Sequence, residues 1–162
     1  MEAATLIANP PTSSTGEPVA GAFSRELQNL WFAVAARTWS ALAVVPAPGV
    51  TGAERMANGL YQIGRRTTLD RPIAILDATH ASVEEVPALA DVLASRVAKG
   101  ERVLVALDQL DENPASLALA SRCDAAILCI ALGASDVKSA RDTVERCGRT
   151  RFLGSVVLVP AR

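Results

Sequence analysis

This chain of 162 residues is poor in histidine and tyrosine and has no excess of one charge. Its only histidine is His80 and its only tyrosine is Tyr61, so a site built from several histidine ligands is excluded. The 16 basic and 17 acidic residues give a net charge of −1, and no basic run is interleaved with aromatic residues. A nucleic-acid partner is therefore excluded.

Close cysteine pairs and long apolar runs are also absent. The three cysteines do not have the Cys-x-x-Cys spacing of zinc and redox sites, and we expect buried, reduced thiols at Cys123, Cys129 and Cys147. The longest apolar runs, such as 125–132, have the length of a strand and fall short of the roughly 20 residues that cross a bilayer. Any membrane contact should go through a partner.

The first twenty residues lack the basic start and apolar segment of a secretory signal, so we expect the protein in the cytoplasm. Residues 1–20 are rich in Ala, Pro, Ser and Thr, which predicts a flexible lead without a core face. The remainder, 21–162, has the size of one domain, and 50% hydrophobic residues are enough for a real core.

From residue 21 onward, helical and strand-like segments alternate. The first helical segment, about 21–38, carries the aromatic residues Trp31 and Phe32, and Trp39 follows it. Unbroken apolar runs without polar alternation are typical of strands covered on both faces, as in a parallel sheet. The pattern predicts a doubly wound α/β domain of about five or more mainly parallel strands. The strands are expected at 41–45, 72–77, 102–108, 125–131 and 152–159, and the later helices at about 52–66, 83–99, 114–121 and 135–147.

The most informative segment is 41–55, an apolar strand that runs through a Gly/Pro turn into a helix. A phosphate-binding loop has this layout, with backbone amides around the phosphate, a lysine for the outer phosphates and a Ser/Thr hydroxyl for the metal. Here there is no lysine between Leu42 and Leu93, and Arg55 is a weak substitute. The residues expected to line a nucleotide site are Pro48, Gly49, Thr51 and Gly52.

Two predicted strands end in an aspartate, at Asp77 and Asp108. Ligands of such sheets bind outside the carboxyl ends of the strands, so both carboxylates are expected beside the loop. The pair could hold hydrated Mg²⁺ and act in phosphoryl transfer. Taken singly, an aspartate after a strand is more often a helix cap or a turn residue.

Several segments, in their order and spacing, resemble the bacterial tyrosine kinases of capsule and exopolysaccharide export, within the MinD/ParA-like P-loop group. Val103–Asp108 resembles the Walker B strand, and Ile73–Asp77 resembles the strand that carries the extra catalytic aspartate of that family. The other matching segments are Ala22-Phe23, Asn29–Phe32, Ser40–Gly49, Cys123–Leu128 and Phe152–Leu158.

The chain departs from that family at the phosphate clamp. Thr51-Gly52-Ala53, or a near shift of it, stands where the family has Gly-Lys-Ser/Thr. At the positions of the family's oligomerising E-x-x-R-x-x-R motif stand Gly21, Ser24 and Leu27. Self-association through that contact is therefore in doubt, and the oligomeric state is open.

The resemblance implies a catalytically impaired kinase-like or ATPase-like accessory protein of exopolysaccharide or capsule synthesis. No cofactor is expected in that case. Its partner would be the cytoplasmic segment of a membrane polysaccharide copolymerase, and the helix at 21–38 would pack on that partner or on its own sheet. One alternative is an active ATPase or kinase that uses ATP and Mg²⁺ through Asp77 and Asp108. A third class, a phosphoacceptor module with Asp77 as acceptor, lacks the expected acidic cluster and late lysine.

Overall fold

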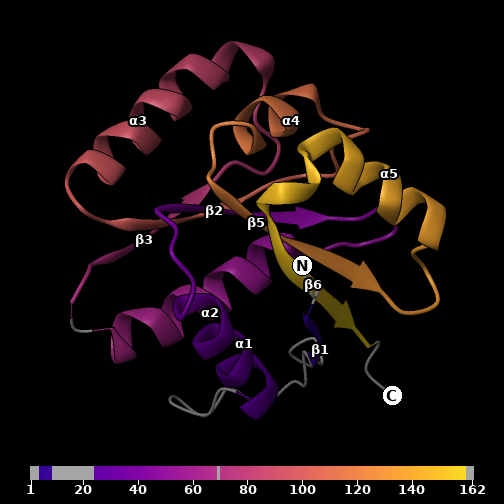
Figure 1. The fold of residues 1–162 in the computed structure, drawn as a ribbon. Coiled ribbons are helices and arrows are strands. Elements are labelled where there is room, and N and C mark those ends of the chain that lie inside the picture. Colours follow the sequence, from indigo (N-terminus) through magenta and orange to yellow (C-terminus); the bar gives the residue numbers. More distant parts are fainter. Residues whose placement is uncertain (1–3, 9–23, 69, 160–162) are drawn as a thin grey trace, which may run out of the picture.

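The computed structural model describes residues 4–8, 24–68 and 70–159, and their strands form one six-stranded sheet (Figure 1). All neighbouring strands are parallel, in the order β1-β6-β5-β2-β4-β3. This arrangement confirms the expected P-loop NTPase-like doubly wound class. The strands are β1 (Ala4–Ala8), β2 (Ala41–Pro46), β3 (Ile73–Asp77), β4 (Arg102–Ala106), β5 (Ala125–Ala131) and β6 (Phe152–Leu158).

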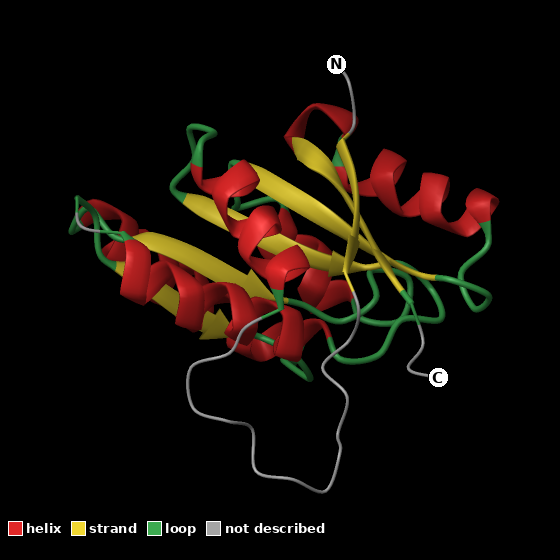
Figure 2. Cartoon of the chain, turned by 90° about the horizontal axis from the view of Figure 1, so that it is seen from below, coloured by secondary structure: helices red, strands yellow, loops and turns green. Residues whose placement is uncertain are grey.

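Helices cover both faces of the sheet (Figures 1 and 2). Two of them, α1 and α2, contact each other on one face, while α3, α4 and α5 follow one another across the other. Right-handed crossovers produce this division, because the chain moves along the sheet in opposite directions before and after β3. The helices are α1 (Arg25–Ala35), α2 (Ala53–Thr67), α3 (Val86–Ala98), α4 (Pro114–Ala120) and α5 (Val137–Cys147), with short 3₁₀ turns η1 (Val83–Glu85) and η2 (Arg149–Arg151).

The core is centred on β2, which lies between β4 and β5. Every residue of β2 is buried, and so are the four residues Val103–Ala106 of β4. Helices on both faces of the sheet explain why these strands are apolar without alternation. The predicted strands and helices are confirmed, with ends that shift by up to a few residues.

The two tryptophans of the first helical region belong to this core. Trp31 and Trp39 are each 1% exposed, and their rings meet edge to face with centroids 6.4 Å apart. The indole N–H of Trp31 donates to Thr67 Oγ1, and that of Trp39 donates to the carbonyl of Val34. Of the aromatic residues considered for partner binding, only Phe32 remains on the surface, with 57% of the residue exposed.

The N-terminal segment differs from its prediction. Residues 1–20 were expected to lack any place in the core fold, but Ala4–Ala8 pairs with β6 as a parallel edge strand, from Ala4 opposite Gly154 to Ala8 opposite Leu158. The prediction failed because a strand of five residues acquires its backbone partners only when β6 is beside it. The rest of the predicted lead, 1–3 and 9–20, lies outside the described residues.

All three cysteines are buried and unpaired, as expected. Burial raises the pKa of Cys123 and of Cys129 to about 12, so both thiols are protonated at neutral pH. Burial also raises the pKa of Cys147. Among the described residues, no helix is both long enough and apolar enough to cross a membrane.

Candidate functional site

The candidate site lies at the carboxyl edge of the sheet, around the loop 47–52 that joins β2 to α2. Because β2 has β4 on one side and β5 on the other, the connections diverge at this point to opposite faces of the sheet. Ligands of doubly wound domains bind at such a switch point. The loop predicted from the sequence therefore lies at the position where this fold forms a site.

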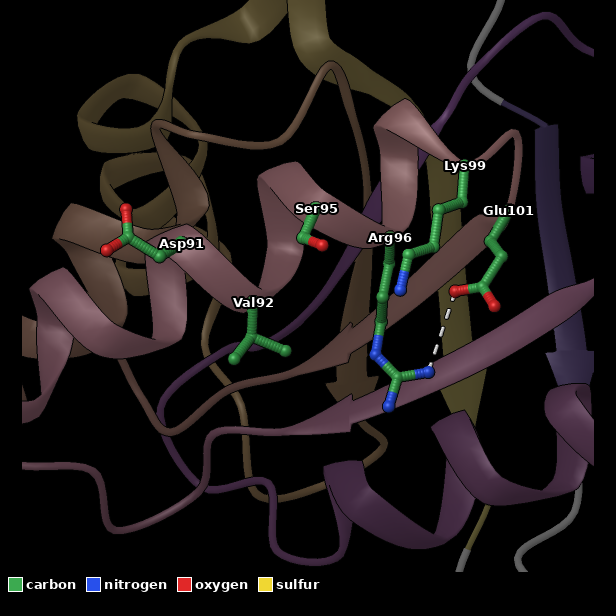
Figure 3. Close-up of a pocket in the computed structure, with 6 residues that line it drawn as sticks. All are labelled: Asp91, Val92, Ser95, Arg96, Lys99 and Glu101. Atoms are coloured by element: carbon green, nitrogen blue, oxygen red, sulfur yellow. Dashed lines mark ion pairs between the residues drawn. The ribbon is translucent and has the colours of Figure 1, made fainter.

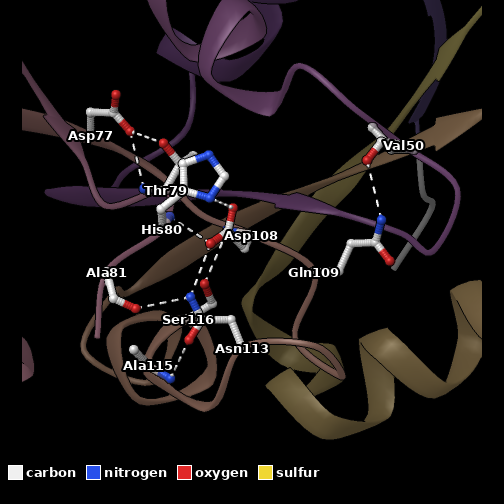
Figure 4. A network of polar contacts seen from close by, with 10 residues as sticks. All are labelled: Val50, Asp77, Thr79, His80, Ala81, Asp108, Gln109, Asn113, Ala115 and Ser116. Atoms are coloured by element: carbon white, nitrogen blue, oxygen red, sulfur yellow. Dashed lines mark hydrogen bonds and ion pairs between the residues drawn. The ribbon is translucent and has the colours of Figure 1, made fainter. Parts of the chain in front are cut away.

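Neighbouring loops hold this loop from both sides. The amide of Ala47 donates to the carbonyl of Cys129 at 2.8 Å, and Ser135 Oγ donates to the carbonyl of Pro48 at 2.8 Å. From the other side, Gln109 Nε2 donates to the carbonyl of Val50 at 3.3 Å (Figure 4). Val50 itself is only 4% exposed, so its side chain anchors the loop in the core.

Gly49 is the point of closest approach within the loop. Its φ is +90°, and a Cβ at this position would lie 2.6 Å from the carbonyl oxygen of Ala134. Only glycine combines that left-handed backbone with the lack of a side chain. The turn is thus pressed against the backbone of the loop after β5.

The start of α2 indicates which residues would align with the phosphate clamp of a P-loop. Gly52, with a φ of +88°, is the last residue before the helix, and Ala53 is the first helical residue. If Gly52 is the second glycine of the G-x-x-x-x-G-K-S/T motif, Ala53 stands in place of the lysine and Glu54 in place of the Ser/Thr. The sequence alone had left this register uncertain by one residue.

These residues do not fit a nucleoside triphosphate. Ala53 is 2% exposed and offers no charge, while Glu54 puts a carboxylate in the first turn of the helix. A carboxylate there stabilises the helix N-terminus, which is also the position at which a P-loop binds phosphate. A bound phosphate at the start of α2 would therefore lie near the negative charge of Glu54.

Within the described residues, the arginines of α2 do not compensate for the missing lysine. Arg65 and Arg66 are in the last turn of α2, about 18 Å along the helix from its first turn. Arg55 is in the first turn, and its Cδ would lie 3.7 Å from a Cβ placed on Gly52, so its stem folds toward the loop. Its planar guanidinium is a poor substitute for a lysine folded over the phosphates.

The two aspartates are not equally close to the loop. Asp108 follows β4, the direct neighbour of β2, whereas Asp77 ends β3, the edge strand beyond β4. The sequence predicts both aspartates beside the loop. By strand order, only Asp108 follows a strand adjacent to β2, so the prediction holds for Asp108 alone.

Asp108 connects its own loop to the loop after β3 and to α4 (Figure 4). Its Oδ2 accepts from the backbone N–H of His80 at 2.6 Å and from Asn113 Nδ2 at 2.9 Å. Its own N–H donates to the hydroxyl of Ser116, which is fully buried. These contacts give Asp108 a structural role whether or not it also binds a cation.

Asp77 and His80 lie in one tight turn. Asp77 Oδ1 accepts from the N–H of Thr79 at 3.0 Å and from its hydroxyl at 2.5 Å, as an aspartate at a turn commonly does. His80 has a φ of +62°, and its side chain is 92% exposed with Nδ1 3.9 Å from Asp108 Oδ1. Within the described residues, no group of three or more His, Cys, Asp or Glu side chains could hold a metal ion.

Asp108→Ala should lower the free energy of unfolding by about 2 to 3 kcal/mol, because the donors on His80 and Asn113 lose their shared acceptor. Asp77→Ala should cost less than about 1 kcal/mol, since the Asp77 side chain is exposed and bonds only within its own turn. Urea denaturation of both variants measures the difference. Equal losses would show that the Asp108 contacts are not the structural link described above.

Sequence reasoning did not identify four polar residues that shape the site. Gln109 and Ser135 hold the loop, and Asn113 and Ser116 hold Asp108. Only Asn113 had a readable signal, since an Asn followed by Pro114 is a typical helix start, and its side chain does cap α4. Gln109 and Ser135 contact residues 59 and 87 positions away in the chain, whereas Ser116 contacts Asp108 from eight positions away in α4.

Comparisons with known proteins do not name a family for this arrangement. The sequence matches neither a protein-family model nor a curated protein.

Proposed function

We propose that this chain is a catalytically impaired relative of P-loop ATPases and acts by binding another protein. The observation that supports the proposal is the start of α2, where Ala53 and Glu54 replace the lysine and the Ser/Thr of a phosphate-binding loop. The fold keeps the switch point at the end of β2, so a nucleotide-type scaffold remains without the charges that serve the nucleotide.

The electrostatic change is large enough to favour loss of ATP hydrolysis over a small reduction of its rate. A unit charge about 4 Å from a phosphate oxygen contributes about 4 kcal/mol at an effective dielectric constant of about 20. Loss of the lysine alone therefore corresponds to roughly a thousandfold in affinity, before repulsion from Glu54 is added. Phosphoryl transfer depends almost wholly on positioning and charge, so the rate should fall as well.

The resemblance to the bacterial tyrosine kinases suggests the pathway. On that basis the protein would serve exopolysaccharide or capsule synthesis and export, in the cytoplasm, through the cytoplasmic segment of a membrane polysaccharide copolymerase. The exposed ring of Phe32 on α1 is the large apolar side chain that this helix offers to such a partner.

Calorimetric titration with MgATP tests the first part of the proposal. We expect no saturable heat up to about 1 mM nucleotide, because the loop lacks its cation and α2 begins with a carboxylate. A P-loop ATPase titrated under the same conditions is the positive control. Saturable heat in the micromolar range would overturn the proposal.

The same titration covers the alternative, an active ATPase or kinase that uses Asp77, Asp108 and Mg²⁺. That alternative requires micromolar binding of MgATP, and the binding should weaken in Asp77→Asn and Asp108→Asn.

These two variants also test the assignment to polysaccharide synthesis. Polymer output should fall when the gene is deleted and should return with either variant, provided that the variant is folded. Normal output in the deletion strain would contradict the assignment to polysaccharide synthesis.

A further inference from the structure

The outer face of α3 has an unusual composition for a surface helix; Figure 3 shows part of it, with Asp91, Val92 and Ser95 drawn as sticks. Of its thirteen residues only Ala90 and Leu93 are buried. Its exposed residues are mostly small or apolar, and Val92 is 41% exposed. They are Pro87, Ala88, Asp91, Val92, Ala94, Ser95 and Ala98.

α5, on the same side of the sheet, shows the contrast. Apart from Val137 at its start, the exposed residues of α5 are all charged: Lys138, Arg141, Asp142, Glu145 and Arg146. Charged residues are the usual solvent face of an amphipathic helix. α3 lacks them along most of its length, which is typical of a helix face that a protein partner covers.

The position of α3 leaves this face accessible. It packs on β4 and against α4, and it lies beside β3, the edge strand of the sheet (Figure 1). A groove of about 440 Å³ runs along the helix, lined by Asp91, Val92, Ser95, Arg96, Lys99 and Glu101. Arg96 and Glu101 form an ion pair at 3.6 Å, so that arginine is already engaged.

Two opposite charges on this face have no partner. Neither the carboxylate of Asp91 nor the ammonium of Lys99 makes a hydrogen bond or ion pair with the described residues. Eight residues of helix separate them by about 12 Å, too far for the two to pair with each other. Ser95 lies halfway, four residues from each, on the same stripe of the helix.

We propose that α3 is a homodimer interface, in which it packs antiparallel against α3 of a second copy around a twofold axis at Ser95. The symmetry brings Asp91 of each copy opposite the partner's Lys99, so each unpaired charge acquires its complement twice. The small side chain of Ser95 at the axis allows the helices to approach closely, and Val92 lies beside the partner's Ala98. This inference does not depend on the proposed function.

Sedimentation equilibrium of the full chain between about 1 µM and about 500 µM tests the proposal. One helix pair is smaller than a standard stable interface, so the wild-type protein should dimerise with a micromolar dissociation constant. Asp91→Lys or Lys99→Asp alone should raise that constant roughly tenfold, because each swap creates two like-charge contacts. The double swap, Asp91→Lys with Lys99→Asp, should restore dimerisation.

Matched swaps on α5 control for net charge. Asp142→Lys and Lys138→Asp make the same charge changes on another exposed helix, and they should leave the dissociation constant unchanged. Circular dichroism confirms that every variant is folded. A monomer throughout the concentration range, a dimer indifferent to the single swaps, or a double swap that fails to restore association would each overturn the proposal.

Discussion

Gly49→Ala should lower the free energy of unfolding by more than about 3 kcal/mol. A methyl group at this position would lie 2.6 Å from the carbonyl oxygen and 2.9 Å from the carbonyl carbon of Ala134. Both contacts are with backbone, which cannot turn aside as a flexible side chain could. The φ of +90° adds a conformational penalty for any residue with a Cβ.

The backbone opposite Gly49 is itself held in place. The amide of Ala134 donates to the carbonyl of Ala131 at 3.1 Å, and Ser135 connects that loop to Pro48. A shift that makes room for the methyl group would therefore break hydrogen bonds on the other side of the contact. This is why we expect the alanine to be costly.

Gly133→Ala is the matched control for backbone strain alone. Gly133 has a φ of +82°, and nothing lies within 4 Å of a Cβ placed on it. Gly133→Ala should lower the free energy of unfolding by about 1 kcal/mol. Urea titrations followed by the fluorescence of the buried Trp31 and Trp39 measure both variants. Equal costs at the two positions would show that the loop at Gly49 can move away from Ala134.

Arg102→Ala should destabilise the fold by about 3 kcal/mol. Its guanidinium lies over the Trp39 ring, 4.3 Å from the centroid. From there Nη1 donates to the carbonyl of Ala35 at 3.1 Å, Nη2 to that of Arg37 at 2.5 Å and Nε to that of Trp39 at 3.3 Å. Arg102 thus ties the start of β4 to the end of α1.

Partial burial of Arg102 makes the charged form of its guanidinium less favourable. Burial lowers the pKa of Arg102, and the charge of Arg71 lowers it further. The guanidinium nevertheless remains protonated near neutral pH, and a positive charge is favourable beside the last carbonyls of a helix.

The lysine variant tests whether the shape of the guanidinium matters. Arg102→Lys keeps the charge, but an ammonium group cannot reach three carbonyls as the planar guanidinium does. The free energy of unfolding should therefore still fall by about 1.5 kcal/mol. Arg37→Ala is the control, because the Arg37 side chain is exposed and should cost less than about 0.5 kcal/mol. A lysine variant as stable as the wild type would show that charge alone accounts for the effect.

Much of the candidate site could be predicted because it lies in chain order on regular elements. A turn after an apolar strand indicated the loop at Gly49 and Gly52, and aspartates after two other strands indicated Asp77 and Asp108. The hydrogen bond from His80 to Asp108 could not be predicted, because His80 comes from a separate loop, 28 residues away in the chain. Asn113 lies in the same loop as Asp108, but its sequence signal indicated only the helix cap.

The residue pattern alone determines the sequence of strands and helices from residue 24 onward and the absence of a lysine from the loop. Apolar periodicity and turn residues are local signals, and they act within a few positions of the chain. They also predict a parallel sheet, because only strands covered on both faces are apolar without alternation.

Tertiary structure decides the place of β1 beside β6, the burial of Trp31 and Trp39, and the start of α2 at Ala53 directly after Gly52. Each depends on a contact between segments far apart in the chain. A strand needs the hydrogen bonds of its neighbour, an aromatic ring needs the face that covers it, and a helix start depends on what holds the loop before it. No local pattern contains these contacts.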